Sequence, residues 1–260
     1  MILDIFKADA FTDKVFGGNP AAIIPLVEWL PDQLMQQIAS ENNLSETAFL
    51  VKEGEYYRIR WFTPAVEVDL CGHATLAAAH VLITNLGFKG PQIKFISRSG
   101  ELFVDLDNEL LILNFPAIDI TNESVPQDLI DGFNIEPQEV YKANEDYFFV
   151  FKNEKEIADL DPDFGQLKKT KSRGIICTAK GDQVDFVSRF FAPAAGIDED
   201  PVTGSAHTKL IPYWSKRLEK TKMVAWQISS RKGELFCTHL GDRVLIAGKA
   251  VSYLEGKISV

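Results

Sequence analysis

Two pairs of a glycine and a polar residue stand where an acidic loop gives way to an apolar segment, and their types could do chemistry. Gly72-His73 follows the loop VEVDLC, and Gly204-Ser205 follows the loop AGIDEDPVT. The start of a helix has unpaired N–H groups and a partial positive charge, and glycine lets a ligand approach this backbone closely. We therefore expect these two helix starts to bind an anion, such as a carboxylate or a phosphate. A purely packing role for each glycine is the alternative.

Two titratable residues lie close to these helix starts. The positive field of a helix start lowers the pKa of an imidazole, which favours a neutral His73 able to donate or accept a proton. A capping or structural histidine is the alternative. Asp200 precedes Gly204 by four residues, and Pro201 fixes the turn between them. Its nearest match in the first half of the chain is Asp69, before Gly72.

Glu46 is a further candidate for acid–base chemistry. It stands between Ser45 and Thr47, immediately before the apolar run at 48–51. A carboxylate at the edge of a buried strand is readily desolvated, which raises its pKa towards neutrality. A surface position is the ordinary interpretation of such a residue, and the local sequence leaves both open.

The chain repeats itself. A spacing of about 130 residues is too long for a solenoid repeat but matches the size of a domain. We therefore expect an internal duplication, with its boundary within residues 114–128, which hold two prolines and no apolar period. The four matching segments, in nearly constant register, are Pro31-Asp32 with Pro162-Asp163, RWFTPA (60–65) with RFFAPA (189–194), GHA (72–74) with GSA (204–206), and SRSGELF (97–103) with SRKGELF (230–236).

The sequence pattern of each half predicts strands around one buried helix. Short β-rich runs dominate, and many alternate apolar with polar residues as half-buried strands do. The segment 73–86 is apolar on nearly all sides, so a helix there must be enclosed by strands. Its counterpart runs from Ser205 to about Leu218, and Pro212 should kink it. A second, amphipathic helix is expected to begin at Pro31, with the inner face Leu34, Met35 and Ile38.

Composition restricts the class of partner. The 260 residues are 46% hydrophobic and 25% charged, as in ordinary globular proteins. The net charge of −10 disfavours nucleic acids and anionic membranes, so we expect a small-molecule partner. The N-terminus lacks a basic leader and the apolar stretch 74–83 is too short to span a bilayer, which favours a cytoplasmic protein. The three cysteines, Cys71, Cys177 and Cys237, show neither a disulfide framework nor metal-ligand spacing.

Four longer motifs follow one another along the chain: FGGNPAAI at 16–23, NLSETAFL at 43–50, EVDLCGHATLAAA at 67–79 and DEDPVTGSAH at 198–207. Together they resemble the signature of the PhzF family, the phenazine-biosynthesis-type isomerases with the fold of diaminopimelate epimerase. The resemblance implies an α+β fold of two pseudo-symmetric domains, each a curved, mostly antiparallel sheet or barrel around a central helix. We place these domains at residues 1–117 and 118–260, with the active site in the cleft between them. The resemblance also implies a homodimer.

The resemblance assigns roles to the candidate residues. The phenazine enzyme isomerises a dihydro-hydroxyanthranilate without a cofactor, and its glutamate takes a proton from one carbon and returns one elsewhere on the ring. That glutamate matches Glu46 through the SETAF motif. The residues that match the family's catalytic-site histidine, aspartate and serine, and the two glycines that help hold the substrate carboxylate, are His73, Asp200, Ser205, Gly72 and Gly204.

One difference limits which reaction is implied. Diaminopimelate epimerases use a thiol at the start of each central helix, and the corresponding positions here are Cys71 and Thr203. Cys71 at a helix start should have a lowered pKa. The Thr203 hydroxyl, with no activating base in evidence, cannot act as a second acid or base at neutral pH. A two-thiol racemase is therefore disfavoured.

We expect a cofactor-independent isomerase, without a metal, that moves a proton within a small carboxylate-bearing substrate. Glu46 would be the acid and base, and His73 and Asp200 would assist it. An epimerase, racemase or dehydratase on the same fold is one alternative. A carboxylate-binding protein that has lost catalysis is the other.

Overall fold

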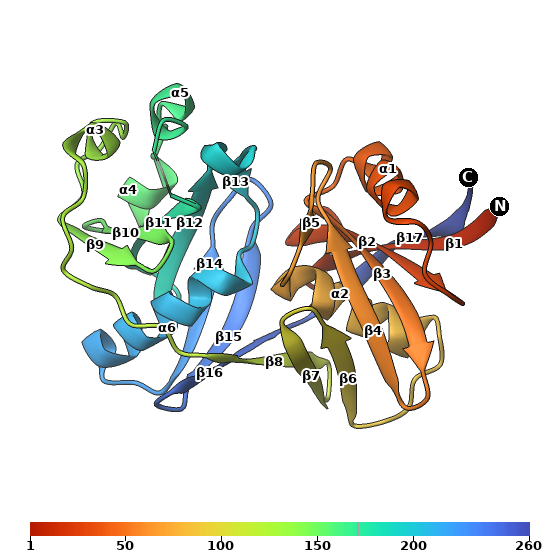
Figure 1. Cartoon of the computed structure of the whole chain (residues 1–260). Coiled ribbons are helices and arrows are strands. Elements are labelled where there is room, and N and C mark those ends of the chain that lie inside the picture. Colours follow the sequence, from red (N-terminus) through yellow and green to blue (C-terminus); the bar gives the residue numbers. More distant parts are fainter. Residues whose placement is uncertain (171) are drawn as a thin grey trace. The chain divides into compact units, whose positions relative to one another are not determined.

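The computed structural model describes residues 1–170 and 172–260, which form two compact units (Figure 1). Unit 1 comprises Met1–Asn114 and Ala247–Val260, and unit 2 comprises Phe115–Ile246. We expected a single division between residues 117 and 118, but the chain passes between the units twice. The reason is the final strand, β17 (Ala250–Ser259), which pairs antiparallel with β1 (Ile2–Ala10) and so belongs to unit 1.

Unit 1 is a mixed sheet of neighbouring strands in the order β17, β1, β2, β3, β4, β6, β7 and β8, with β5 added beside β4. The pairs β2–β3 and β4–β6 are parallel, and the other pairs are antiparallel. The remaining strands of this unit are β2 (Asn19–Leu26), β3 (Glu46–Glu53), β4 (Tyr56–Phe62), β5 (Glu67–Val68), β6 (Gln92–Ser97), β7 (Gly100–Asp107) and β8 (Leu110–Pro116), whose last two residues lie in unit 2.

Unit 2 pairs its strands in the order β9, β10, β11, β12, β14 and β15, with β13 beside β12. Here β10–β11 and β12–β14 are the parallel pairs. The strands are β9 (Glu139–Ala143), β10 (Asp146–Val150), β11 (Gly174–Lys180), β12 (Phe186–Ala192), β13 (Ile197–Asp200), β14 (Lys222–Gln227), β15 (Gly233–His239) and β16 (Arg243–Gly248), whose last two residues lie in unit 1. The short helices are α3 (Gln127–Ile130), α4 (Glu154–Ala158), α5 (Phe164–Leu167) and the 3₁₀ turn η1 (Pro193–Ala195).

The two units share one succession of strand pairings. In each, a parallel pair is followed by an antiparallel hairpin, a short added strand, a second parallel pair and a second hairpin. A matching ion pair closes each short strand: Arg60 binds both oxygens of Glu67, and Arg189 binds both oxygens of Glu199. The duplication expected from the sequence is thus present in the topology.

Helix α2 (Gly72–Thr84) is the buried helix of unit 1 and packs against β1, β2, β3 and β17. It begins one residue before, and ends two residues before, the expected segment. Helix α1 (Asp32–Asn42) carries Met35, Ile38 and Ala39 on its buried face, with Leu34 only half-buried. Strands therefore enclose α2, as its apolar surface requires.

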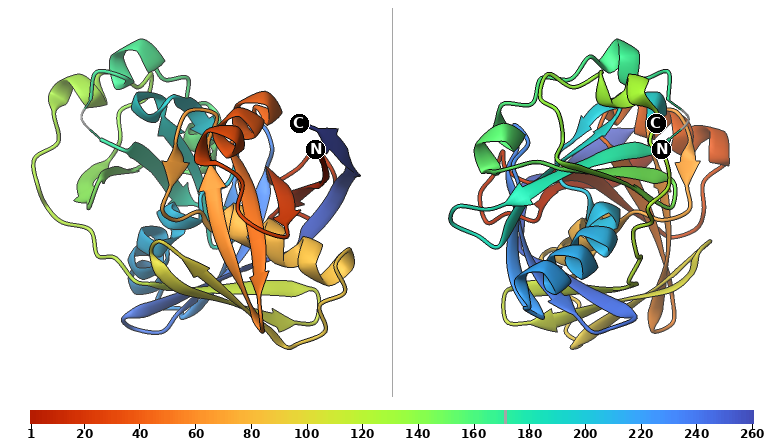
Figure 2. Two further views of the ribbon diagram at one scale, coloured as in Figure 1. Left: turned by 45° about the vertical axis from the view of Figure 1, so that its right-hand side comes forward. Right: turned by 90° about the vertical axis from the view of Figure 1, so that its left-hand side faces the viewer.

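Helix α6 (Gly204–Leu218) occupies the same place in unit 2 and contacts β15 (Figure 2). It continues through Pro212, which cannot donate a hydrogen bond to the carbonyl of Thr208. The backbone N–H of Ile118 donates to that carbonyl at 3.0 Å instead. Pro212 therefore opens an acceptor on which the segment entering unit 2 is anchored. Among the described residues, no helix combines the length and apolar character needed to cross a membrane.

Candidate active site

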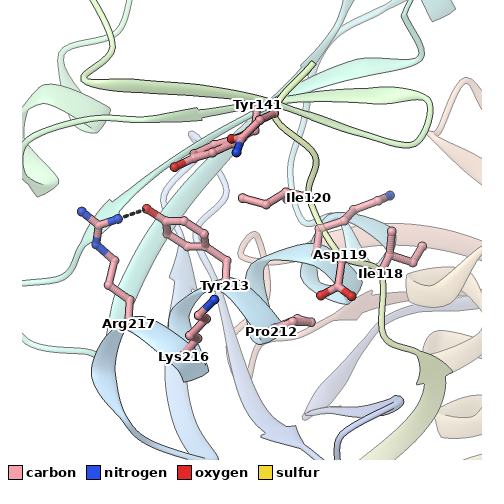
Figure 3. Close-up of a pocket in the computed structure, with 10 residues that line it drawn as sticks. Ile118, Asp119, Ile120, Tyr141, Pro212, Tyr213, Lys216 and Arg217 are labelled. Atoms are coloured by element: carbon pink, nitrogen blue, oxygen red, sulfur yellow. Dashed lines mark hydrogen bonds between the residues drawn. The ribbon is translucent and has the colours of Figure 1, made fainter. Parts of the chain in front are cut away.

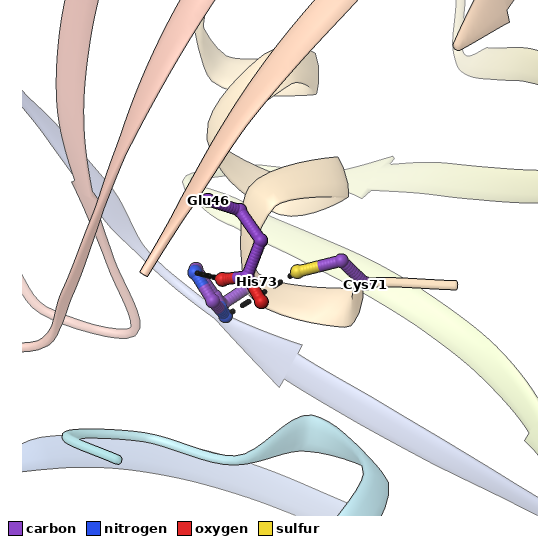
Figure 4. A group of neighbouring side chains, drawn as sticks. All are labelled: Glu46, Cys71 and His73. Atoms are coloured by element: carbon purple, nitrogen blue, oxygen red, sulfur yellow. Dashed lines mark hydrogen bonds and ion pairs between the residues drawn. The ribbon is translucent and has the colours of Figure 1, made fainter. Parts of the chain in front are cut away.

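Unit 1 brings Glu46, Cys71 and His73 together (Figure 4). Glu46 is the first residue of β3, and His73 lies in the first turn of α2, which Cys71 caps. His73 Nε2 lies 3.0 Å from Glu46 Oε2, and the two side chains are only 6% and 13% exposed. The contact is at ion-pair distance but lacks the alignment of a good hydrogen bond. The alternative interpretation, that Glu46 lies at the surface, is therefore wrong.

Asn19 orients the His73 ring from the other side. It is the first residue of β2 and fully buried, and its Nδ2 lies 3.2 Å from His73 Nδ1. An asparagine can serve either protonation state of the ring, because turning its amide exchanges a donor for an acceptor. We assigned no role to Asn19, although it lies in the FGGNPAAI motif. The sequence feature that could have identified Asn19 is a polar residue at the start of an apolar strand.

The pKa of His73 is shifted opposite to our expectation. Burial alone lowers the pKa of this imidazole, but the charges of Cys71 and Glu46 outweigh it and raise the pKa well above 6.5. The net shift is therefore opposite to the one expected from the helix start alone.

The pKa of the Cys71 thiol is also shifted in the direction opposite to our expectation. Burial raises its pKa to about 11, and the neighbouring Glu46 charge acts in the same direction. Cys71 is 7% exposed, and desolvation disfavours a thiolate more than the helix start favours it. The thiol is a neutral neighbour of His73 Nδ1, at 3.6 Å.

The same three residues raise the question of a metal site, because their ligand atoms lie within 4.8 Å of one another. A metal bound by an imidazole lies on the lone pair of one ring nitrogen. Here the carboxylate adjoins Nε2 and the thiol adjoins Nδ1, on different edges of the ring. The ring thus lies between the carboxylate and the thiol, and this arrangement also suits acid–base chemistry.

Unit 2 places Asp200 beside the start of α6. Asp200 ends β13, and its Oδ2 accepts the hydroxyl proton of Thr203, the residue that caps α6, at 2.5 Å. Gln227 fixes the same turn, since its side chain accepts from Thr203 N at 2.8 Å and donates to Asp200 O at 2.8 Å. The expectation that Thr203 has no base beside it is therefore wrong. An alcohol paired with a carboxylate is still a weak acid, however, and does not replace a thiol at neutral pH.

Ser205 follows in the first turn of α6 and contacts a charged group that the sequence analysis missed. Arg173 donates from Nη1 to Ser205 Oγ at 2.8 Å. The same guanidinium binds both oxygens of Asp146, a carboxylate with no exposed surface. Lys209 Nζ donates to Asp146 Oδ2 at 2.9 Å and to Ser205 O at 3.2 Å. Neither Arg173 nor Asp146 lies in a motif that drew attention to it.

A second buried histidine, His207, also lies in the first turns of α6. Its Nδ1 lies 2.8 Å from the carbonyl oxygen of Thr203, and its ring packs against Phe186. Burial lowers the pKa of His207 to about 4. The ring is therefore neutral at physiological pH, with its Nδ1 proton on Thr203 O.

A surface pocket of about 720 Å³ lies within unit 2 (Figure 3). It is lined by the segment Ile118–Ile120, by Asn122, by Tyr141 of β9 and by the α6 residues Lys209, Pro212, Tyr213, Lys216 and Arg217. Arg217 donates to Tyr213 Oη and pairs with Glu139, so its charge is already compensated. This pocket contains none of the six residues expected to do chemistry or to bind the substrate.

Comparison with known proteins agrees with the fold. The family model for phenazine biosynthesis-like proteins, PhzC-PhzF, matches residues 8–256. The crystal structure of a PhzF family protein from Enterococcus faecalis has a TM-score of 0.97 at 46% identity, covering 100% of both chains. A structure described as a predicted epimerase, from Pseudomonas aeruginosa, has a TM-score of 0.78 at 16% identity and shares the fold. The expected diaminopimelate epimerase-like fold class is confirmed.

The descriptions of curated relatives indicate the class of activity. Two uncharacterised isomerases of Pseudomonas aeruginosa are 51% and 52% identical to this chain over 258 residues, covering 99% of it and 99% of each relative. An uncharacterised isomerase of Halalkalibacterium halodurans is 44% identical over 263 residues. The chain therefore belongs to the PhzC-PhzF family of phenazine biosynthesis-like proteins, and it is an isomerase.

Proposed function

We propose that the enzyme moves a proton from one carbon to another within a small carboxylate-bearing substrate, without a cofactor. The observation that carries this proposal is the buried pair of Glu46 and His73, whose side chains meet at 3.0 Å. A carboxylate and an imidazole held together out of water form an acid–base couple that works without a metal or a bound cofactor.

Glu46 is assigned as the group that carries the proton. Its carboxylate accepts a proton from a carbon of the substrate, and the resulting carboxylic acid returns one to a different carbon. The double bond shifts, and no oxidation or reduction takes place. The cationic His73 stabilises the negative charge that develops on the substrate when the C–H bond breaks, because the charge forms in a site with little water. Asn19 keeps the ring in place during both steps.

The substrate carboxylate is assigned to the helix starts at Gly72 and at Gly204-Ser205. Backbone N–H groups and the partial positive charge of a helix start favour an anion there. Asp200 is assigned to assist proton transfer from its place beside Thr203.

Solvent exchange tests this function across many candidate substrates at once. The enzyme is incubated with pools of small carboxylic acids in deuterated water, and mass spectrometry identifies acids that gain deuterium. We expect carbon-bound deuterium in at least one acid with the wild type and none with Glu46→Gln. Exchange at a carbon whose configuration inverts would instead support an epimerase. Binding without exchange across the panel would support a binding protein and contradict the proposal.

A further inference from the structure

The Ser205 hydroxyl has one of its bonding directions fixed by a cation. A guanidinium has only donors, so the bond of 2.8 Å from Arg173 Nη1 makes Ser205 Oγ an acceptor. The hydroxyl proton of Ser205 must then point elsewhere. Among the residues that the structure describes, no acceptor takes this proton, and it is left for a ligand.

Arg173 itself is held rigidly. Its Nε and Nη2 donate to the two oxygens of the fully buried Asp146, and this fork is the strong, planar geometry of arginine–carboxylate pairs. The guanidinium also lies 5.3 Å from the centre of the Phe190 ring. Gly174 makes room for that ring, because a Cβ at this position would lie 2.2 Å from Phe190 Cζ.

The cluster carries an excess of positive charge. Lys209, which is 5% exposed, also pairs with Asp146, so two cations share one carboxylate. The Arg173 side chain is 35% exposed, and it is therefore the cation of the cluster that can act on a ligand in water.

The duplication allows the cluster of Arg173, Asp146 and Ser205 in unit 2 to be compared with the equivalent positions of unit 1. Arg173 directly precedes β11 in unit 2, and Ser45 directly precedes β3 in unit 1. In unit 1 the position next to the helix start holds the acid–base pair of Glu46 and His73, and in unit 2 it holds Arg173 and Ser205. One copy of the repeat thus presents proton-transfer groups, and the other presents a cation and a hydroxyl donor.

We propose that Arg173 is a positioning residue that makes the Ser205 end of the site selective for a carboxylate over a neutral group. It orients the Ser205 proton towards the anion and adds a charge beside it. This inference rests on the proposed function, which assigns the substrate carboxylate to Ser205.

Paired probes of equal shape test the selectivity. The isotopically labelled full-length chain is titrated with anthranilate and with the neutral anthranilamide, and the backbone amide signals of Gly204 and Ser205 are followed by NMR. We expect the wild type to prefer anthranilate. Arg173→Gln should weaken anthranilate binding about tenfold to a hundredfold, as for a lost charged hydrogen bond, and leave anthranilamide binding unchanged. The matched control is Arg217→Gln, which also breaks a fork to a carboxylate, Glu139, in unit 2 and should keep the preference.

Arg173→Lys keeps the charge beside Asp146 if Arg173→Gln fails to fold. One ammonium cannot reproduce a fork to Asp146 together with the bond to Ser205, so we expect an intermediate preference. An unchanged preference in both variants, or an equal loss for both probes, would overturn the role of Arg173. If acetate, benzoate and anthranilate all fail to shift these signals in the wild type, the carboxylate assignment of the proposed function itself fails.

Discussion

His73 and Glu46 meet through Nε2 and Oε2 at 3.0 Å, while the other nitrogen of the ring faces Asn19 and Cys71. The ring therefore has an anionic neighbour on one edge and neutral neighbours on the other. This asymmetry favours a cationic ring beside an anionic carboxylate. It also makes Glu46 the group on which the electrostatics of the site depend.

Replacing Glu46 by Gln should stop catalysis while preserving the fold. The amide fills the same space in β3 but has no carboxylate to take up a proton, and general acid–base catalysis contributes about 10²–10⁴-fold. We expect deuterium uptake to fall by that factor. Glu53→Gln is the matched control, because Glu53 ends the same strand and pairs with Arg58 and Tyr56 at the surface. A Glu46→Gln enzyme with half the wild-type rate would remove Glu46 from the mechanism.

The same substitution should lower the pKa of His73. The Glu46 carboxylate raises this pKa, and the amide of Glu46→Gln carries no charge. Histidine-ring NMR signals titrated between pH 5 and about 9 would follow the change, given the usual pKa of about 6.5. His80 is the internal control, since burial lowers its pKa and it bonds Ser252 rather than a carboxylate. An unchanged His73 titration would contradict the cationic ring proposed here.

The raised pKa of His73 makes the contribution of the Glu46–His73 pair to the free energy of unfolding depend on pH. Because the pKa of His73 is higher in the folded than in the unfolded chain, the ion pair contributes its full stabilisation below pH of about 6.5, the unfolded value. This contribution is lost as the pH rises through the folded pKa. In Glu46→Gln the loss should be absent from the pH dependence of urea unfolding.

The sequence predicted the parts of the fold that depend on local pattern. The all-apolar run of α2 could only be a buried helix, and the matches RWFTPA and RFFAPA lie at equivalent ends of β4 and β12. The strand β17 was missed because most of its residues are exposed and it has no continuous apolar face. Its place beside β1 is a pairing between the two ends of unit 1, which no local pattern encodes.

The site residues, too, could be predicted where a local sequence motif marks them and not where the contact is long-range. Glu46, His73, Asp200 and Ser205 lie in motifs, and the structure places each beside a helix start or a strand end as expected. Arg173 could not be found in this way, because its partners lie 27 and 32 residues away along the chain. The directions of the His73 and Cys71 pKa shifts were wrong for a related reason. A helix-start field is visible in a sequence, whereas burial and a carboxylate from another strand are not.

His207 should make the enzyme acid-sensitive. Its pKa is about 4 in the folded protein and about 6.5 when exposed, so the unfolded chain binds a proton that the folded chain does not. The stability contributed by this ring is complete above pH of about 6.5 and falls as the pH drops towards 4, by about 3 kcal/mol in total. Urea unfolding of wild type and His207→Gln across this range would give the difference. Parallel curves for the two proteins would show that His207 does not titrate on unfolding.

Cys71 separates the proposed mechanism from a thiol-based epimerase. Its thiol has a pKa of about 11 and is protonated at neutral pH, so it should react slowly with iodoacetamide, and faster as the pH rises. Position 203 offers only a hydroxyl, which its bond to Asp200 does not turn into a thiol-like acid. With Glu46 as the proton carrier, Cys71 contributes packing beside His73.

Cys71→Ser should therefore retain most of the turnover with a modest loss of stability, and Thr203→Cys should not create racemase activity. Turnover of both variants, combined with chiral analysis of the product, measures the outcome. Cys237→Ser is the matched control, because Cys237 is a buried thiol of unit 2 that lies on β15, outside the site. If Cys71→Ser is as inactive as Glu46→Gln, or if the wild type inverts a stereocentre, a mechanism carried by one carboxylate is wrong. The thiol would then have to be the second acid, working through His73 Nδ1, which it approaches at 3.6 Å.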